Sequence, residues 1–509
     1  MKTHGLLDIS IRNEYTERDI PASFSITELM STPTRRDFLK QFATAASVIG
    51  AVPYFLSSQQ PVLAQAPSDR LRMGCIGVGS MGRGDARGFN GLVDIVAICD
   101  VDSRHLDLTQ ENNNIGEKDA NGNKHKLDAY KDYRKILERK DIDVVTVVTP
   151  DHWHTKIAIE ALQAGKHVFC QKPLTLTVEE SQLVRAACKK YGKTFQVGTQ
   201  QRSQRDQFAL AALMIRKGLL GDIQKMTCDI GGSPTCGPIP KAAVPETLDF
   251  EMWLGQAPLV EYIASAEKAS GGWPRNSRTH YEFRWWYEYG GGKFSDWGAH
   301  HVDCALWALN RLGDGQGPVK FNPLVFDHPV PYKDGYPTED NQYNTSHKFD
   351  IECTFADGVI LRIVSKSPDG NGILFEGTKG KMHVNRERIK GKPYEDIGGK
   401  MEANGQAVAY AQNPELQKVF PTEEFDTLCH GKKFEGHKQN FISCIREGGL
   451  PISDVYTHVQ AINVCHLSAI AARLGREIAW NPEAEKTGDT QSQSFLARKQ
   501  RKGYEISRT

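Results

Sequence analysis

The sequence predicts an α/β fold, in which a Rossmann domain with a doubly wound parallel sheet precedes an α+β domain with a mostly antiparallel open sheet. Two observations lead to this prediction. Between residues 71 and 198, short apolar runs alternate with helical patterns, and the first of these runs ends in a glycine-rich turn. From residue 199 onward the alternation stops, and strand-like runs are separated by loops rich in glycine and proline.

These changes of pattern divide the chain into four parts. Residues 1–66 form an N-terminal extension with an export signal, 69–198 the Rossmann domain, 199–482 the α+β domain for substrate binding and oligomerisation, and 483–509 a polar tail. Helices predicted at 437–446 and 455–474 are candidates to pack back against the Rossmann domain.

The composition excludes several classes of protein. Of 509 residues, 39% are hydrophobic and 25% charged, which is typical of globular domains rather than of a disordered chain. The formal net charge is +1, so no overall field favours nucleic acid or an anionic membrane. The eleven cysteines include no Cys-x-x-Cys pair and no zinc-like spacing, which favours folding in a reducing compartment without structural metal.

The N-terminal extension carries the pattern of a Tat signal peptide. Arg35 and Arg36 precede an Ala-rich apolar stretch that is too short for a stable membrane span, and PVLAQA supplies small residues for cleavage, best placed after Ala64. The alternative is a membrane anchor that is never cleaved. Because Met30 directly precedes STPTRRDFLK, either Met1 or Met30 could be the true start. We expect export to the periplasm by the Tat machinery, after a cofactor has been loaded in the cytoplasm.

The glycine-rich turn predicts a dinucleotide site. Gly77 permits the tight turn, Gly79 lets the backbone approach a pyrophosphate, and Gly82 lets the helix pack closely on the strand. Ser80 and Met81 lie between them, where the phosphates would meet free N–H groups at the positive end of the helix.

A second apolar run at 93–99 ends in Asp100, at the distance expected of the acid that binds the ribose hydroxyls. A carboxylate there repels a 2′-phosphate, so the sequence favours NAD over NADP. Further strands at 143–148 and 167–170 alternate with helices at 155–164 and 177–191, as a parallel sheet requires.

Three motifs resemble those of the Gfo/Idh/MocA oxidoreductases, the family of glucose-fructose oxidoreductase and inositol dehydrogenase. They are VTPDHWH, GKHVFCQKPLT and GGGKFSDWGAHHVD, in this order, and the resemblance extends from about residue 70 to about residue 482. It implies a Rossmann domain followed by an α+β domain whose sheet commonly mediates oligomers, so we expect a homo-oligomer.

The resemblance also implies an active site at Lys172, Asp296 and His300. Oxidation of a secondary alcohol needs a base near neutral pKa for the hydroxyl proton and a cation beside the developing alkoxide. His300 suits the base, Lys172 the cation, and Asp296 a group that orients or assists. Gln171 replaces the family's usual glutamate and removes a negative charge next to Lys172.

Other candidate contacts follow from the same motifs and from a tryptophan-rich stretch of the second domain. By resemblance, Thr149, His154 and Gln171 border the cofactor. Aromatic faces beside Arg284 suit a sugar ring, although tryptophans fill cores and interfaces as often. The candidate substrate contacts are Gln200, Arg202, Arg284, Trp286 and His301. His300, His301 and Asp303 lack the spacing of metal ligands, so we expect no metal.

The sequence therefore predicts an exported enzyme, an NAD-dependent oxidoreductase that acts on a secondary hydroxyl of a sugar, polyol or sugar derivative and transfers hydride to a tightly bound nucleotide. Two alternatives remain open. One is a redox-neutral, NAD-dependent glycoside hydrolase, and the other is a non-catalytic sugar-binding homologue. The sequence decides neither the sugar nor the direction of reaction.

Overall fold

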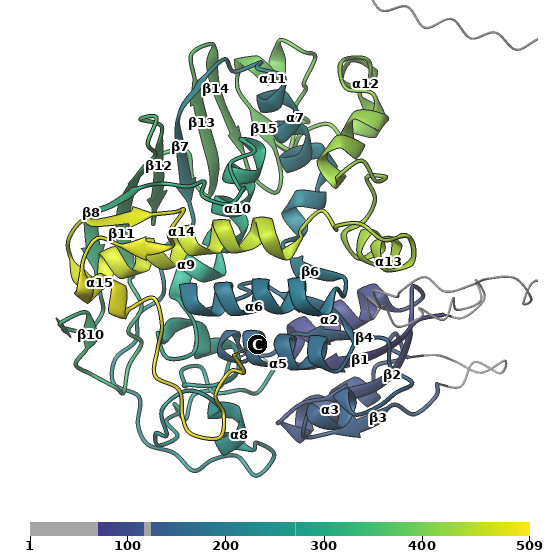
Figure 1. Cartoon of the computed structure of the whole chain (residues 1–509), viewed down its shortest axis with the longest axis vertical. Helices are drawn as coiled ribbons and strands as arrows, with labels where there is room; N and C mark the ends of the chain where they lie inside the picture. The colour runs from purple at the N-terminus through teal and green to yellow at the C-terminus, as the bar shows by residue number, and fades with distance from the viewer. Residues whose placement is uncertain (1–69, 117–123, 270, 509) are drawn as a thin grey trace, which may run out of the picture. The chain divides into compact units, whose positions relative to one another are not determined.

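The computed structural model describes residues 70–116, 124–269 and 271–508, which belong to one compact unit of the chain (Figure 1). The predicted signal at Arg35 and Arg36, with its cleavage site after Ala64, lies outside the described residues. Among the residues that the structure does describe, no helix has both the length and the apolar character needed to span a membrane.

The first domain is built on a six-stranded parallel sheet in the order β3-β2-β1-β4-β5-β6. Its strands are β1 (Arg72–Ile76), β2 (Asp94–Cys99), β3 (Asp128–Tyr130), β4 (Val144–Val147), β5 (His167–Gln171) and β6 (Phe195–Gly198). Its helices are α2 (Ser80–Phe89), α3 (Ser103–Gln110), α4 (Arg134–Leu137), α5 (Asp151–Gln163) and α6 (Val178–Tyr191). One apolar cluster joins the sheet to α4, α5 and α6, and another joins it to α2 and α3, so helices cover both faces.

The second domain holds a nine-stranded sheet in the order β15-β14-β13-β7-β12-β11-β8-β16-β17. The strands are β7 (Ile223–Asp229), β8 (Lys320–Asp327), β11 (Lys348–Thr354), β12 (Ile360–Val364), β13 (Gly372–Gly377), β14 (Gly380–Val384), β15 (Ile389–Lys390), β16 (Ile478–Asn481) and β17 (Lys486–Thr487). Every neighbouring pair is antiparallel except β12 and β7. The predicted fold class, a parallel Rossmann sheet followed by a mostly antiparallel sheet, is therefore confirmed.

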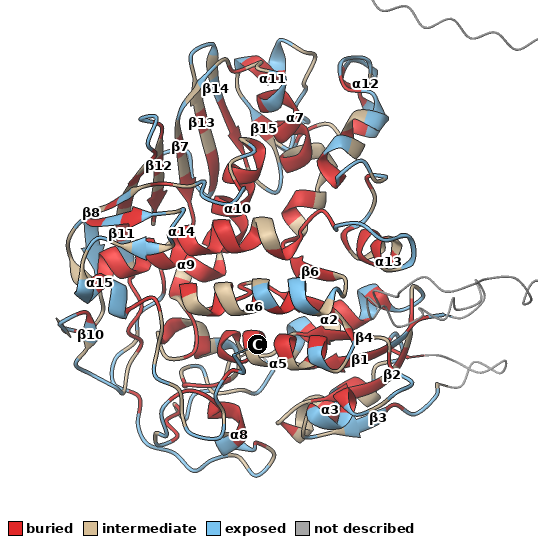
Figure 2. Ribbon diagram, viewed as in Figure 1, coloured by how far each residue is buried: buried red, intermediate tan, exposed pale blue. Residues whose placement is uncertain are grey.

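Helices α7 (Leu210–Arg216), α10 (Gly298–Ala308) and α14 (Val455–Leu474) contribute to one core cluster with this sheet. Figure 2 shows α10 and α14 as mostly buried. The remaining elements are α8 (Phe250–Leu254), α9 (Gly292–Asp296), β9 (Tyr332–Lys333), β10 (Tyr336–Pro337), α11 (Lys392–Glu395), α12 (Pro414–Val419), α13 (His437–Glu447) and α15 (Thr490–Ser494). Phe441 of α13 and Val459 of α14 also enter the cores of the Rossmann domain, so these two helices do pack back against it.

The C-terminal segment, predicted only as a polar tail, is folded. After β17 and α15 it returns to the Rossmann domain, where the ring of Tyr504 meets Trp153 edge-on with centroids 5.8 Å apart. Lys156 Nζ donates to the Glu505 carbonyl at 2.9 Å, and Ile506 is buried. The polar composition of this segment did not predict that it folds, because the apolar residues that anchor it are few and scattered.

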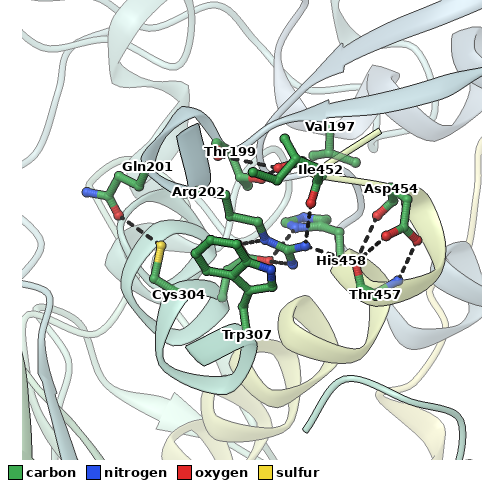
Figure 3. A network of polar contacts seen from close by, with 12 residues as sticks. Val197, Thr199, Gln201, Arg202, Cys304, Trp307, Ile452, Asp454, Thr457 and His458 are labelled. Carbon is green, nitrogen blue, oxygen red and sulfur yellow. Dashed lines mark hydrogen bonds and ion pairs between the residues drawn. The ribbon is translucent and has the colours of Figure 1, made fainter. Parts of the chain in front are cut away.

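A buried ion pair lies directly after β6, where the chain enters the second domain (Figure 3). Arg202 follows β6, and its Nε and Nη2 donate to the Asp303 carboxylate of α10 at 2.7 and 2.6 Å. Its Nη1 donates to the Ile452 carbonyl and to Thr457 Oγ1, both at 3.0 Å. Because both charged side chains are almost fully buried, each depends on the other for compensation of its charge.

We expect Arg202→Ala to lower the free energy of unfolding by about 3–5 kcal/mol, because it leaves the Asp303 carboxylate buried and unpaired. Urea denaturation followed by circular dichroism measures this. Arg134→Ala, which breaks an exposed pair with Asp132, is the control and should change stability by less than about 1 kcal/mol. Equal effects of the two substitutions would contradict the assignment of Arg202 as a structural residue.

Candidate active site

The turn between β1 and α2 has room for a ligand where the sequence predicts the pyrophosphate. Gly77 has φ +80°, and a Cβ there would meet the Val148 carbonyl oxygen at 2.5 Å, while a Cβ on Gly82 would meet the Gly77 carbonyl oxygen at 1.9 Å. A Cβ on Gly79 would meet nothing nearer than the His105 ring at 3.5 Å. Packing within the protein therefore demands the first and third glycines, whereas a Cβ at the second would make only ordinary van der Waals contact with the His105 ring.

The start of α2 is suited to phosphate groups. No side chain caps this helix and its first turn contains no acidic residue, so its first N–H groups keep their positive potential. Ser80 and Met81, in this first turn, are exposed. The residues present thus fit a dinucleotide at the place where the sequence predicts one.

Asp100 lies at the carboxyl end of β2 and braces this turn. Its Oδ2 accepts the Val78 N–H at 2.9 Å, and its Oδ1 accepts the Asp102 N–H at 3.0 Å. His105 Nδ1 lies 3.2 Å from Oδ2. The carboxylate is therefore held beside the glycine-rich turn, and its contact with ribose hydroxyls stays a prediction.

Thr149 and His154, which we expect to border the cofactor, lie after β4 and in α5 respectively. His154 is buried, with Nδ1 2.6 Å from the Pro173 carbonyl oxygen and Nε2 2.8 Å from the Thr149 carbonyl oxygen. Burial lowers the pKa of His154 to about 4, so the imidazole is neutral and donates to one of these carbonyls. It thereby links the segments that follow β4 and β5. Thr149 Oγ1 is buried and finds no hydrogen-bond partner among the described residues.

A negative charge lies close to Gln171, although the Gln171 side chain itself is neutral. Its Nε2 donates to Asp85 Oδ2 at 2.7 Å, and its Oε1 accepts the Lys172 N–H at 3.1 Å. Asp85 Oδ1 in turn pairs with Lys438 Nζ at 2.9 Å. The negative charge that the family's glutamate would carry is therefore still present nearby, but Asp85, the hydrogen-bond partner of Gln171, carries it.

Lys172 and Asp296 meet between the two domains. Lys172 Nζ lies 2.7 Å from Asp296 Oδ1 and 2.9 Å from the Asp296 carbonyl oxygen, and both side chains are about one-eighth exposed. Lys172 follows β5, whereas Asp296 ends α9, so the pair brings the carboxyl edge of the Rossmann sheet against the second domain.

Three cations surround the Asp296 carboxylate. Besides Lys172, Arg284 Nε lies 3.6 Å from Oδ1 and Lys293 Nζ lies 3.8 Å from Oδ2. Burial opposes ionisation of Asp296, but Lys172 and Arg284 outweigh it and hold the pKa of Asp296 below its usual value. Asp296 is therefore a permanent anion that fixes the position of Lys172.

His300 lies one turn further along, on α10. It is buried, and this burial, together with Lys172 and Arg386, lowers the pKa of His300 well below its usual value. Its Nδ1 has no hydrogen-bond partner among the described residues. The imidazole is thus neutral at pH 7 and able to accept a proton, although its pKa lies below the near-neutral range that we expected of the base.

The candidate substrate contacts lie in different environments. Arg284 joins the Asp296 cluster, and Gln200 is half-buried after β6. His301 is fully buried, with Nδ1 3.1 Å from the Asp229 carbonyl oxygen. For Arg202 and Trp286, contact with a substrate stays a prediction. Arg202 is occupied by Asp303, and Trp286 is completely buried with its Nε1 donating to the Ser277 carbonyl.

Sequence reasoning missed Lys293 and Asp151. Lys293 lies three residues before Asp296 in GGGKFSD, a helical spacing that could have identified it. Asp151 is in the VTPDHWH motif at the start of α5. Burial raises the pKa of Asp151 to about 8, against the opposing effect of Arg284 and Lys172. A carboxyl group that titrates near neutral pH therefore lies within the field of the same cations.

The glycine-rich turn, the acid after β2 and the Lys172–Asp296 pair define a two-domain protein that binds a dinucleotide. Two models of one oxidoreductase family match the chain, one described as its NAD-binding Rossmann fold over residues 71–199 and the other as its C-terminal alpha/beta domain over 236–392. Together they span more than half of the chain, which therefore belongs to the Gfo/Idh/MocA oxidoreductase family and has an NAD-binding domain.

Curated relatives match over a shorter stretch. A glycosyl hydrolase family 109 protein of Shewanella pealeana is 34% identical over 213 residues, which are 37% of this chain and 44% of the relative. A protein of the same name from Shewanella baltica is 30% identical over 208 residues, with the same shares. The matched part thus spans less than half the length of these relatives.

Solved structures share the fold across most of the chain. Levoglucosan dehydrogenase in complex with NADH and levoglucosan has a TM-score of 0.50 and 20% identity, over 79% of this chain and 98% of that one. The WlbA dehydrogenase of Bordetella pertussis, in complex with NADH and UDP-GlcNAcA, has a TM-score of 0.50 and 19% identity, over 81% and 99%. At these identities the likeness shows the fold alone.

We expect Asp151→Asn to change how stability depends on pH. A folded-state pKa above the unfolded value means that unfolding releases a proton between about pH 4 and pH 8, so this group makes stability fall as pH rises through that window. The asparagine variant should show a flatter slope and a higher free energy of unfolding at about pH 8. Urea titrations across the window measure both quantities.

Asp340→Asn provides the control, because that carboxylate is 89% exposed and its replacement should leave the slope unchanged. An Asp151→Asn slope equal to that of the unmodified protein would show that Asp151 titrates normally.

Proposed function

We propose that the chain is an NAD-dependent oxidoreductase that acts on a secondary hydroxyl of a sugar, polyol or sugar derivative. The observation that carries this proposal is the Lys172–Asp296 pair, which lies where the NAD-binding sheet meets the second domain and whose lysine helps to keep the buried imidazole of His300 neutral. Ligands in open α/β folds bind at this edge. The carbohydrate ligands named in the levoglucosan and UDP-GlcNAcA complexes support the substrate class.

Each residue of the cluster has a distinct part in this proposal. NAD, when bound, accepts the hydride. His300 accepts the hydroxyl proton, because burial keeps its imidazole neutral. Lys172 stabilises the negative charge that develops on the substrate oxygen. Asp296 orients Lys172, while Lys172, Arg284 and Lys293 together keep Asp296 ionised.

Thr149 and Gln171 border the cofactor in this account, and Asp100 selects NAD over NADP through its charge. Comparison of the dissociation constants of the two nucleotides tests the selection, and equal values would contradict it.

We expect Lys172→Ala and His300→Ala each to lower kcat by about 100-fold to 10,000-fold while NAD stays bound, because both residues act on the reacting hydroxyl and neither contacts the pyrophosphate. Steady-state kinetics on a panel of sugars and polyols, with nucleotide content measured by mass spectrometry, checks both statements. The control is Lys225→Ala, which removes a partly exposed lysine of β7 and should retain full activity. Near-native kcat in His300→Ala would place the base elsewhere.

The family 109 relatives favour a second candidate, a redox-neutral glycoside hydrolase that reduces and reoxidises the same bound nucleotide. If this candidate is right, the protein should cleave a glycoside for many turnovers with no net gain in the absorbance of reduced nicotinamide. A simple dehydrogenase should instead yield one reduced nucleotide for each sugar oxidised. Parallel measurement of released aglycone and of absorbance distinguishes the two. The third possibility, a non-catalytic sugar-binding homologue, predicts neither signal.

We also propose that the Tat machinery exports the folded protein to the periplasm, either cleaved after Ala64 or anchored by an uncleaved signal. The support is the twin arginine at Arg35 and Arg36 and the apolar stretch behind it. Because the periplasm supplies no pool of NAD, export favours a nucleotide that is retained through turnover. Cell fractionation of the unmodified chain and of a double Arg→Lys variant tests this, and equal export of both would contradict it.

Homo-oligomerisation through the second sheet remains part of the proposal, and sedimentation of the purified protein measures it.

A further inference from the structure

A segment of the second domain packs against the residues that follow β2, although the two segments are far apart in the sequence. We call residues 271–280 the covering segment. Arg104 Nη2 donates to the Gly271 carbonyl at 2.7 Å, and the Arg104 guanidinium lies 4.3 Å from the centre of the Trp273 ring. Trp273 stacks on His280 with centroids 4.0 Å apart, and its ring also meets that of His105 at 5.0 Å.

A side-chain contact between His280 and Asp102 fixes the far end of the covering segment. His280 Nε2 lies 2.9 Å from Oδ2 of Asp102, which is 1% exposed and whose Oδ1 accepts the Arg104 N–H at the start of α3. His280 Nδ1 lies 2.9 Å from the hydroxyl of Thr279, which is fully buried. His280 also has φ +56°, a left-handed conformation that non-glycine residues seldom adopt, so the side-chain contacts offset a local backbone cost.

Backbone contacts hold a neighbouring stretch of the second domain to the same loop. The Asp249 N–H donates to the Val101 carbonyl, and the Ser103 N–H donates to the Thr247 carbonyl, both at 2.9 Å. The second domain therefore contacts each residue from Val101, directly after β2, to His105 in the first turn of α3.

This loop marks one end of the nucleotide groove. In Rossmann domains the acid after the second strand binds the adenosine ribose, and Asp100 holds that position next to the glycine-rich turn. The His105 ring connects Asp100 with the glycine-rich turn, because its Nδ1 lies 3.2 Å from Asp100 Oδ2 and the ring is the group nearest to a Cβ built on Gly79. The covering segment thus lies beside the adenosine half of the site rather than beside Lys172.

We infer that the covering segment closes the adenosine end of the NAD site and makes release of the nucleotide slow. Release then requires the Trp273–His280 stack to separate from the Rossmann domain and the His280–Asp102 contact to break. The inference rests only on NAD binding within the proposed function, not on the sugar chemistry. Ligand atoms of Asp102, His105 and His280 also lie within 4.8 Å of one another, but each imidazole already faces a carboxylate, so we interpret the cluster as two histidine–carboxylate contacts.

The dissociation rate of NADH from the purified protein tests this inference. Bound NADH is displaced by excess NAD, and the decay of its fluorescence is followed with chelator present, so that no cation held by the cluster contributes. We expect Trp273→Ala and His280→Ala to raise the dissociation rate by at least about tenfold and to lower the fraction of protein that is purified with nucleotide.

Arg275→Ala is the matched control, because Arg275 lies within the covering segment and its exposed side chain pairs only with Glu267 among the ion pairs of the described residues. Its dissociation rate should equal that of the unmodified protein. If His280→Ala fails to fold, Trp273→Leu replaces it, since leucine fills part of the space but cannot stack. Dissociation rates that are the same in the unmodified protein and in Trp273→Ala would overturn the inference.

The assay separates this inference from the chemistry proposed above. Measured in a Lys172→Ala background, slow release and its loss in Trp273→Ala would support the closure even in a protein without turnover. Fast release from the unmodified protein, with sugar oxidation intact, would overturn the closure and leave the oxidoreductase proposal unaffected.

Discussion

The ion pair between Lys172 and Asp296 is the interaction on which the candidate site depends. Lys172 is placed by the parallel sheet of the first domain, and Asp296 by a short helix of the second. Neither side chain alone defines a reaction centre, because each needs the other to hold its charge in a mostly buried position. The packing of α13 and α14 against the Rossmann domain holds the two domains, and with them Lys172 and Asp296, in place.

Burial has opposite consequences for the groups around that pair. It keeps His300 neutral and raises the pKa of Asp151, whereas the surrounding cations overcome it at Asp296. One small region thus holds a fixed anion, a neutral imidazole and a carboxyl group that titrates near neutral pH. Groups with such different proton affinities, side by side, are what transfer of a hydroxyl proton requires.

Local sequence rules predicted the fold and part of the site. Helix α6 is an example, because it was expected at 177–191 and spans Val178–Tyr191: the Glu180 N–H donates to Thr177 Oγ1 at its start, and Gly192 follows its end in the left-handed conformation. The glycine-rich turn and Asp100 followed from equally local spacing. Arg202 and Trp286 could not be assigned in this way, because a sequence does not tell which distant segments bury a side chain. The same holds for the bond from Gln171 to Asp85, two residues 86 positions apart.

Transfer of deuterium from a carbohydrate to the bound nucleotide tests the central claim most directly, because it reports hydride transfer whether the overall reaction is oxidative or redox-neutral. The purified protein is mixed with sugars, polyols and glycosides deuterated at the ring carbons, and the nucleotide is then extracted and analysed by mass spectrometry. The account predicts deuterium on the nicotinamide of the unmodified protein and none with Lys172→Ala. Turnover of a carbohydrate with an unlabelled nucleotide, or equal labelling in both proteins, would contradict it.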